Sequence, residues 1–452
     1  MILRRIFIAN RGEIAVRIIR TCQRLGIETV LGASEADLDS MGARMADRTI
    51  CIGPASSSES YLNVEAVVAA AVTAKADAIH PGYGFLAENQ KLAEACNRSD
   101  IIFIGPTAAQ LDGVGDKLKA RMHAAACGLP GVPGGEVRGL EEAKRLADEI
   151  GWPILIKAVG GGGGRGMKQV HDAGNLAAMI EMAISEAQAA FGDPRVYLEH
   201  YISHGRHIEV QVLGDGENVV HLGTRDCSIQ RRYQKLVEEA PAPNLRESHR
   251  EEMHCAAIAF ARHLKYKGLG TVEMLVDCDR NAFYFLEMNA RIQVEHPVTE
   301  TICGLDLVEE QITVAEGRKL RLKQSDVSFS GHAIECRINA EDWTQDFRPS
   351  PGTVTRISFP TGPGIRVDTH MQAGAKVPPY YDSLLGKLIV HGGDRTEAIH
   401  KMRRALSLFE IAGVMTNISM HAELMHDEEF ARGGANTAFL PRFLKNRITV
   451  AI

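Results

Sequence analysis

The chain has 452 residues, more than one hydrophobic core usually spans, so two or three domains are expected. Its 45% apolar and 24% charged residues are typical of a globular protein, and no run approaches the 18 apolar residues of a membrane span. The formal charge of −6 argues against nucleic-acid or membrane-surface binding, and nine scattered cysteines without a CxxC pair indicate reduced thiols in the cytoplasm, with no disulfide frame and no zinc site.

Strands and helices alternate over the first 112 residues, which is typical of a parallel α/β unit. The N-terminal apolar stretch is too short for a signal peptide and is predicted to be the first strand. Periodic patterns predict strands at 6–10, 28–31, 78–80 and 101–104, and helices at 13–25, 61–75 and 87–97. His80-Pro-Gly-Tyr-Gly-Phe85 follows a strand end, where open α/β sheets bind ligands.

The middle of the chain continues with a mixture of predicted helices and strands, and short strands and turns predominate from about residue 330. A Gly/Pro-rich joint at 131–139 separates a predicted helix at 117–127 from a helix at 141–150 and a strand at 153–159. Short strands and turns after 330 predict a third, β-rich domain, with strands at 332–339, 352–358, 364–369 and 387–391 and helices near 395–409 and 417–427.

Five glycines, Gly160 to Gly164, lie between the strand that carries Lys157 and a predicted return strand at 167–170. Backbone N–H groups of such a loop can approach phosphate oxygens. No helix opens after the glycines and no GxxxxGK[ST] occurs, so neither a dinucleotide fingerprint nor a Walker A loop fits. A flexible linker is the less favoured alternative, because linkers seldom lie between two β-runs. The pattern predicts a mobile flap over a nucleotide's phosphates, contacted by Lys157 and by Lys117 of Gly-Asp-Lys, although a lone lysine is usually a solvated charge.

Residues 287–295 alternate between polar and apolar side chains, so an extended chain would carry five polar groups on one face: Glu287, Asn289, Arg291, Gln293 and Glu295. Upstream, two β-runs around a turn-like 278–281 predict a hairpin, and a turn centred near Arg280 would set Glu273 opposite Glu287. Like charges facing each other are destabilising unless a divalent cation such as Mg²⁺ lies between them. A register slip of one residue would instead leave two solvated carboxylates.

The chain resembles biotin carboxylase, the ATP-grasp component of biotin-dependent carboxylases. Each motif alone is weakly specific, but together, in this order, they are highly specific and cover nearly the whole chain. The motifs are IANRGEIAVRI (8–18), HPGYGFLAEN (80–89), GDK (115–117), IKAVGGGGGRGM (156–167), RHIEVQVL (206–213), RDCSIQRRYQKLVEEAPAP (225–243), EMNARIQVEHPVTE (287–300), ECRINAED (335–342) and PSPG (349–352).

The resemblance implies an α/β fold, α+β overall, in three parts. These are an N-terminal parallel α/β domain (1–112), an ATP-grasp core (113–330) whose mobile glycine-rich lid spans about 131–203, and a C-terminal β-rich domain (331–452). It also implies an ATP-dependent ligase. ATP and bicarbonate would give carboxyphosphate and ADP, and the carboxyl group would then pass to N1′ of biotin on a carrier protein.

The resemblance assigns roles to residues at the motif positions. The metal ligands for Mg²⁺ or Mn²⁺ would be Glu273, Glu287 and Asn289. ATP would contact Lys117, Lys157, His207 and the backbone of Gly163 and Gly164, with its adenine and ribose near Glu199, His200, Tyr201, Ile202, Gln230 and Tyr233. Bicarbonate would be held by Lys235, Arg291, Gln293 and the Val294 N–H, with Glu295 as the base; biotin would lie near Arg337, Tyr83, Gly84 and Glu88.

Ordinary structural roles are the alternative at several of these positions. Polar and apolar side chains alternate in 206–213, so His207, Glu209 and Gln211 could simply form the solvent-exposed face of a strand. This alternative is favoured for Glu209 and Gln211. Arg231 and Arg232 could form salt bridges, Glu295 could pair with Arg291, and Arg337 could be solvated.

Two positions depart from the usual family pattern. Tyr233 stands where the family usually has histidine, which leaves ATP affinity in doubt because a phenol cannot become cationic. His200 replaces the usual lysine, with little effect expected if that position acts through its backbone.

The metal, the phosphates and bicarbonate must meet within a few ångströms, yet a straight strand would spread residues 287–295 over roughly 26 Å. The segment is therefore expected to leave its strand after Asn289 and bend.

No Met-Lys-Met biotin-attachment turn occurs, so the chain is expected to act with a separate biotin carboxyl carrier protein and a separate carboxyltransferase subunit; a homodimer is the family expectation. Acetyl-CoA is the favoured final acceptor, with propionyl-CoA, pyruvate or others as alternatives. Three further hypotheses are a different ATP-grasp ligase, a nucleotide-binding protein without catalytic activity and, least favoured, an NAD-linked dehydrogenase.

Overall fold

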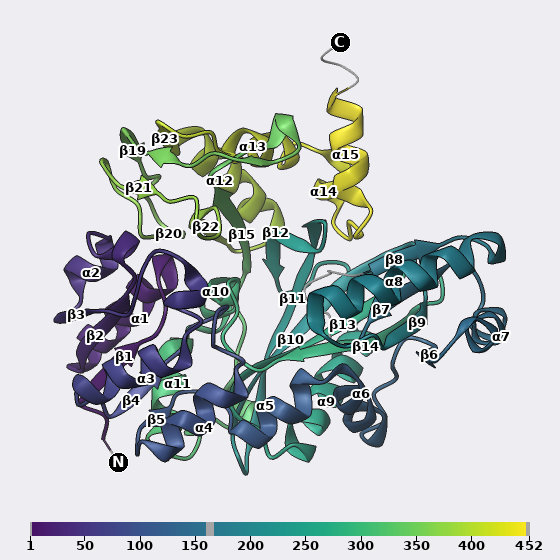
Figure 1. The fold of residues 1–452 in the computed structure, drawn as a ribbon. Helices are drawn as coiled ribbons and strands as arrows, with labels where there is room; N and C mark the ends of the chain where they lie inside the picture. The colour runs from purple at the N-terminus through teal and green to yellow at the C-terminus, as the bar shows by residue number, and fades with distance from the viewer. Residues whose placement is uncertain (1, 160–166, 449–452) are drawn as a thin grey trace.

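The N-terminal part is a parallel α/β layer, as predicted. The computed structural model describes residues 2–159 and 167–448. Five parallel strands lie in the order β3-β2-β1-β4-β5 (Figure 1). The strands are β1 (Arg5–Ile8), β2 (Glu28–Ala33), β3 (Arg48–Cys51), β4 (Ala78–His80) and β5 (Ile102–Phe103), and the helices are α1 (Gly12–Leu25), α2 (Met41–Met45), α3 (Val64–Thr73), α4 (Gln90–Arg98) and α5 (Ala108–Gly115).

Helices α3 and α4 each begin three residues later than the sequence pattern predicts. The side chain of Asn63 accepts the Ala66 N–H, and that of Asn89 accepts the Leu92 N–H. An asparagine that satisfies a free N–H in this way fixes the first turn of a helix. The capping residues therefore set the true starts, which apolar periodicity alone did not reveal.

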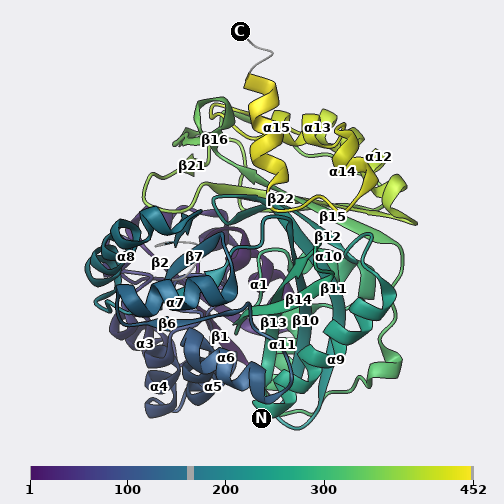
Figure 2. The ribbon, with the colours of Figure 1, turned by 90° about the vertical axis from the view of Figure 1, so that its right-hand side faces the viewer.

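The centre of the molecule is one eight-stranded sheet, in the order β14-β13-β10-β11-β12-β15-β22-β20 (Figure 2). Its strands pair antiparallel throughout. The strands are β10 (Gly205–Asp215), β11 (Val219–Arg231), β12 (Gln234–Ala240), β13 (Lys267–Asp277), β14 (Ala282–Asn289), β15 (His332–Asn339), β20 (Ile365–Thr369) and β22 (Leu384–Gly392). The change of texture near 330 therefore does not begin a separate sheet, because β15 pairs with β12.

Helices pack against this sheet from several parts of the chain. They are α6 (Lys117–Ala126), α9 (Glu247–His263), α10 (His296–Cys303) and α11 (Leu307–Ala315), and α12 (Arg395–Leu408) covers β15 and β22. The remaining C-terminal elements are short: β16 (Glu341–Asp342), β17 (Arg348–Pro349), β18 (Gly352–Thr353), β19 (Arg356–Ser358), β21 (Lys376–Val377), β23 (Glu410–Ala412), α13 (Ile418–Leu424), α14 (Glu428–Arg432) and α15 (Phe439–Ile448). The single strand expected at 352–358 is divided between β18 and β19, which belong to different two-stranded sheets.

A smaller layer projects from the centre beside α6 (Figure 1). Its four strands run in the order β6-β9-β7-β8 under two helices. They are β6 (Gly134–Val137), β7 (Ile154–Ala158), β8 (Met167–Val170) and β9 (Val196–His200), with α7 (Leu140–Ile150) and α8 (Leu176–Phe191). The return strand predicted after the glycines is confirmed, since Lys157 pairs with Met167 in antiparallel register. Gly163 and Gly164 lie outside the described residues.

The predicted hairpin at 271–289 forms with a one-residue irregularity. Asp277 pairs with Ala282 across the turn, but Leu286 has no partner, and from there Glu273 pairs with Glu287. A bulge of this kind shifts one strand by one residue. The expected opposition of the two glutamates is confirmed, although the bulge and not a turn centred on Arg280 produces it.

No described helix is both long and apolar enough to cross a bilayer. All nine cysteines lie within the described ranges and are free thiols.

A stacked histidine pair between β11 and α9 should make the fold sensitive to acid. The rings of His221 and His254 lie 3.7 Å apart and nearly parallel. Burial lowers the pKa of His221 to about 4 and that of His254 to about 3, the latter with help from His221 and Arg250. Since both values lie below the unfolded one, the unfolded chain binds more protons, and stability should fall as pH drops below about 6.5. The free energy of unfolding, measured by urea denaturation between pH 7 and 5, should fall less steeply with decreasing pH in His254→Phe, by the equivalent of about one bound proton. The exposed His400→Phe should match the parent.

Candidate active site

The polar row bends where it was expected to bend. Strand β14 ends at Asn289, residues 290–295 form a turn, and α10 begins at His296. Glu287 and Asn289 therefore lie on a strand, while Arg291, Gln293 and Glu295 lie in the turn. This confirms the prediction that the segment leaves its strand after Asn289.

Lys235 is the cation around which the buried carboxylates gather. Its Nζ lies 2.6 Å from Glu209 Oε2, 2.8 Å from Glu273 Oε1 and 2.7 Å from Glu295 Oε1. Burial alone would lower the pKa of this ammonium, but the three carboxylates raise it well above its usual value. Lys235 thus joins Glu273 on β13, which is predicted for the metal site, to Glu295 on the turn, which is predicted for the bicarbonate site.

Glu295 is fully buried and held between two cations. Besides Lys235, the Arg337 Nη2 atom donates to Glu295 Oε2 at 2.9 Å. Burial would raise the pKa of Glu295, but Lys235, Arg337 and Arg225 lower it instead. The carboxylate is therefore held in its ionised form, which is the form from which a general base starts.

Arg291 pairs with Glu88 and not with Glu295. Its Nε donates to Glu88 Oε2 at 2.8 Å, and its Nη atoms donate to Asn289 Oδ1 and to Gln293 Oε1. Because Glu88 follows the loop after β4, this contact ties the turn to the N-terminal layer. The predicted biotin-side residue Glu88 and the predicted bicarbonate ligand Arg291 are brought together.

The predicted metal ligands meet at the β13–β14 pair. Asn289 Nδ2 donates to Glu273 Oε1 at 2.9 Å, and Gln293 Nε2 donates to the same oxygen at 3.1 Å. Glu287 has no hydrogen-bond or ion-pair partner within the described ranges; burial and the facing Glu273 raise the pKa of its carboxyl group. A pair of facing carboxylates, Glu273 buried and Glu287 half-buried and uncompensated, fits a divalent cation, which would supply the missing positive charge.

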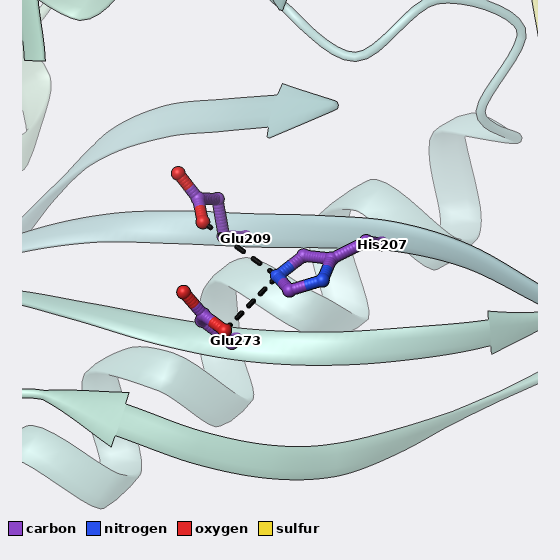
Figure 3. A group of neighbouring side chains, drawn as sticks. All are labelled: His207, Glu209 and Glu273. Carbon is purple, nitrogen blue, oxygen red and sulfur yellow. Dashed lines mark ion pairs between the residues drawn. The ribbon is translucent and has the colours of Figure 1, made fainter. Parts of the chain in front are cut away.

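His207 approaches the same carboxylates from β10 (Figure 3). Its Nε2 lies 3.0 Å from Glu273 Oε2 and 3.8 Å from Glu209 Oε2. Burial would lower the pKa of the ring, but Glu273 raises it. Gln230 Nε2 lies 3.0 Å from His207 Nδ1, so these two residues predicted near ATP are neighbours.

Strand β10 has no wet face at Glu209 and Gln211, so that interpretation is wrong. Both side chains are fully buried, because α10 covers this face of the sheet: Arg225, which binds Glu209, also donates to Thr299 of α10. Arg225 Nε donates to Glu209 Oε1 at 2.6 Å, and its Nη1 to Gln211 Oε1 at 2.7 Å. Arg337 is likewise not solvated, being bound to Glu238 and Glu295.

The predicted adenine-side residues Glu199 to Ile202 lie at the end of β9, a central strand of the projecting layer, and just after it. Glu199 on β9 pairs with Lys157 on β7 and with Arg121 Nη1 at 2.8 Å. Lys117, the first residue of α6, has its pKa lowered by burial despite Glu287 nearby. The Tyr201 N–H donates to the Pro153 carbonyl oxygen, His200 Nδ1 lies 3.1 Å from the Gly151 carbonyl oxygen, and Ile202 is buried.

Tyr233 lies at the tip of the β11–β12 hairpin and is half-exposed. It and Arg232 both have positive φ, 67° and 47°, as a two-residue hairpin turn requires. Arg231 and Arg232 pair with Asp346 at 2.6 and 3.0 Å, which confirms the salt-bridge alternative for these two.

The biotin-side residue Tyr83 reaches the turn through two charged residues. Its hydroxyl donates to Glu13, which lies 3.0 Å from the Lys387 Nζ atom, and Lys387 donates to the Val294 carbonyl oxygen at 2.8 Å. Sequence reasoning missed five buried charges of this site: Glu13, Glu209, Arg225, Glu238 and Lys387. All but Lys387 lie within the family motifs named above, and membership of a motif was the signal in the sequence that could have identified them.

Three family models match the chain in order. The biotin carboxylase N-terminal domain matches residues 2–111, the carbamoyl-phosphate synthase L chain ATP-binding domain matches 116–323, and the biotin carboxylase C-terminal domain matches 335–442. The chain belongs to the biotin carboxylase family. Its predicted fold class and its prediction as an ATP-dependent ligase are thereby confirmed.

Relatives of this biotin carboxylase match along its full length. Biotin carboxylase of Pseudomonas aeruginosa is 49% identical over 446 residues, which covers 98% of this chain and 99% of the relative. A pyruvate carboxylase subunit of Methanothermobacter thermautotrophicus is 48% identical over 442 residues, 97% of this chain and 90% of the relative.

Solved structures agree with the fold. The Campylobacter jejuni biotin carboxylase, a β-γ-ATP complex, superposes with a TM-score of 0.94 at 48% identity and covers 97% of this chain and 99% of that one. The biotin carboxylase domain dimer of Hydrogenobacter thermophilus 2-oxoglutarate carboxylase, with MgADP, ADP and bicarbonate, gives 0.93 at 45% identity and covers 98% of each chain.

Proposed function

We propose that this biotin carboxylase carboxylates biotin on a separate carrier protein, using ATP and bicarbonate through carboxyphosphate. The reaction is the first half of an acyl-CoA carboxylation, with acetyl-CoA as the final acceptor. The observation that carries the proposal is Glu295, an ionised buried carboxylate between Lys235 and Arg337 at the turn that also presents Arg291.

The cations of the turn orient bicarbonate for deprotonation. Arg291, Lys235 and the Val294 N–H hold the anion, and Gln293 adds its side-chain amide. Glu295 accepts the proton of bicarbonate, which is a weak nucleophile until it loses that proton. The carbonate oxygen then attacks the γ-phosphorus of ATP, the bond from that phosphorus to the β–γ bridging oxygen breaks, and ADP leaves as carboxyphosphate forms. Lys117, Lys157 and His207 hold the phosphates, and the fixed cations offset the charge that builds up.

Glu273, Glu287 and Asn289 would hold Mg²⁺, or Mn²⁺, which when bound neutralises phosphate charge. The ligand atom of Asn289 would be its amide oxygen, which accepts from Arg291 and has a second lone pair. The nucleotide, MgADP and bicarbonate of the two similar solved structures support the same ligands for this chain.

Arg337 acts in the second half of the reaction. Its guanidinium stabilises the negative charge on the ureido oxygen that forms when N1′ of biotin loses its proton to the phosphate of carboxyphosphate; the carboxyl group then passes to N1′ and phosphate leaves. Tyr83 and Glu88 line the biotin side of the site, and biotin enters on the carrier protein.

The domain boundaries at 112 and 330 are part of the proposal, with the lid at about 131–203. The matched ranges of the three family models support the two boundaries. The partners are a biotin carboxyl carrier protein, a separate carboxyltransferase, and a second copy of this chain; the Hydrogenobacter dimer supports the last. A cytoplasmic location remains a prediction from composition.

The alternative acceptors are propionyl-CoA, pyruvate and related acids. Relatives named for pyruvate and for 2-oxoglutarate carboxylation resemble this chain about as closely as those named simply biotin carboxylase. Identifying the transferase that copurifies with the chain decides among them.

ADP release tests the activity directly. The expected result is release that requires bicarbonate and rises several-fold with free biotin. Release that persists without bicarbonate would indicate a different ATP-grasp ligase, and release indifferent to biotin would contradict the proposal.

Removing one metal ligand should raise the metal requirement. In Glu287→Gln the carboxylate opposite Glu273 becomes a neutral amide. The Mg²⁺ concentration for half-maximal ADP release should rise by at least about 10-fold, because losing even a group that only orients a ligand usually costs about 10- to 100-fold in metal affinity. The matched control is Asp279→Asn at the tip of the same hairpin, where the side chain is exposed. Equal Mg²⁺ curves for Glu287→Gln and the parent would exclude Glu287 as a ligand.

A further inference from the structure

Two buried glutamates stand directly opposite each other behind Arg337. Glu238 on β12 pairs with Glu335 on β15, and directly opposed residues of antiparallel strands share a face. Both side chains are fully buried. Arg337, two residues after Glu335, points to the same face and donates to Glu238 Oε1 at 2.6 Å.

Three carboxyl oxygens of this pair lack a partner within the described residues. They are Glu238 Oε2 and both oxygens of Glu335. Such atoms are costly unless hydrogen-bonded, because burial removes them from water. One proton between the two groups would give a partner to one oxygen of each, since a carboxylic acid donates and a carboxylate accepts.

Among the described residues around the pair, no further cation is left without a partner to serve these oxygens. The next same-face positions form a small apolar cluster with α10: Ala240, Val298, Ile302, Ala333 and Ile389. Lys387 on β22 is the nearest further cation, and it is already engaged by Glu13 and by the Val294 carbonyl oxygen.

The charges that face the pair are arranged asymmetrically. Arg337 and Lys235 stabilise an ionised Glu238, while Glu295 opposes it; burial nevertheless raises the pKa of Glu238 to about 7. Burial also raises the pKa of Glu335 well above its usual range, opposed by Lys387 and reinforced by Glu238. Glu238 accepts from Arg337, whereas neither oxygen of Glu335 has a partner among the described residues, so Glu335 is the member that carries the proton.

We propose that Glu238 and Glu335 hold one proton between them, and that this shared proton keeps the carboxyl pair behind Arg337 at a single negative charge. The proton is taken from solvent as the chain folds, and it stays bound to Glu335 and hydrogen-bonded to Glu238. Glu335 is in this view a positioning residue that acts through Glu238 and Arg337. This inference rests on the role of Arg337 in the proposed function.

The shared proton sets how freely Arg337 can bind another anion. With one negative charge behind it, the guanidinium can attract charge that develops on the ureido oxygen of biotin. When the proton is lost, two carboxylates compete for Arg337, and biotin turnover should fall. Bicarbonate should be less affected, because Lys235 and Arg291 hold it from the other side.

Infrared spectroscopy tests the proton without reference to activity. The wild-type protein should show the carbonyl band of a buried carboxylic acid at neutral pH, and the band should vanish on titration to alkaline pH. Glu335→Gln should remove it, whereas Glu251→Gln on the exposed side of α9 should not. Absence of the band at neutral pH in the wild type would overturn the proposal, and this arm needs no variant to fold.

Kinetics tests the positioning role with a matched pair of variants. Glu335→Leu removes the donor and should lower kcat/KM for biotin on the order of tenfold, the usual effect of one lost hydrogen bond to a charged group. Its KM for bicarbonate should change less than about twofold. Glu335→Gln keeps an N–H donor and cannot ionise, so it should recover most of the loss.

The pH profile separates this role from simple packing. In the wild type, kcat/KM for biotin should fall at alkaline pH, and Glu335→Gln should move that fall upward by at least about one pH unit. Superposable profiles, or equal defects in the Leu and Gln variants, would overturn the proposal. Loss of biotin stimulation in the wild type itself would count against the proposed function and leave the infrared result standing.

Discussion

Glu295→Gln is expected to lower bicarbonate-dependent ADP release by about 10²- to 10⁴-fold, the usual contribution of a general base. The amide has nearly the same shape as the carboxylate but cannot accept the proton of bicarbonate. Lys235 keeps Glu209 and Glu273 as partners, and Arg337 keeps Glu238, so both cations remain paired in the variant. The loss should therefore lie in kcat more than in folding.

The assay is ADP release with saturating ATP and Mg²⁺, with and without bicarbonate. Glu251→Gln, an exposed change of the same chemistry on α9, serves as the control and should match the parent. Thermal unfolding should give similar midpoints for both variants. Undiminished turnover in Glu295→Gln would instead favour a nucleotide-binding protein without this chemistry.

The sequence predicts the pairing of Glu273 with Glu287 but not how it arises. Alternation and the turn-like 278–281 are local signals, and they place both strands and the opposition of the two glutamates. No feature of the sequence around Leu286 indicates that it is unpaired, because a bulge depends on which backbone groups find partners across the strands. The bend after Asn289 was predictable for a different reason: a straight strand is too long to bring its ends to one reaction centre.

Burial was the property that sequence reasoning could not supply. Glu209 and Gln211 alternate like a solvent-facing row, yet the face they occupy lies under α10 and against the site. Alternation distinguishes two faces without saying whether either is wet. The continuity of the sheet from β12 to β15 was equally hidden, since strand pairing across the change of texture near 330 is a long-range contact.

Arg225 is the clearest example of a residue whose importance only the fold reveals. It is fully buried, and four hydrogen bonds join its guanidinium to neighbours from three elements. The acceptors are Glu209 Oε1 at 2.6 Å, Gln211 Oε1 at 2.7 Å, Thr299 Oγ1 at 2.8 Å and Thr271 Oγ1 at 3.1 Å. It thus connects β10, β13 and α10 directly behind the carboxylates that Lys235 holds.

Arg225→Met should destabilise the protein by about 3–5 kcal/mol, the usual result of removing one partner of a buried ion pair. Glu209 would keep Lys235 and, at 3.8 Å, the His207 ring as partners, and its charge would have little access to water. Arg232→Met is the matched control, because that side chain is 72% exposed and its pairing with Asp346 should contribute less than about 1 kcal/mol. Urea unfolding at pH 7 gives both values. A loss below about 1 kcal/mol in Arg225→Met would mean that Glu209 takes up a proton or finds water once Arg225 is gone, and that the charges behind the site are less tightly coupled than their contacts imply.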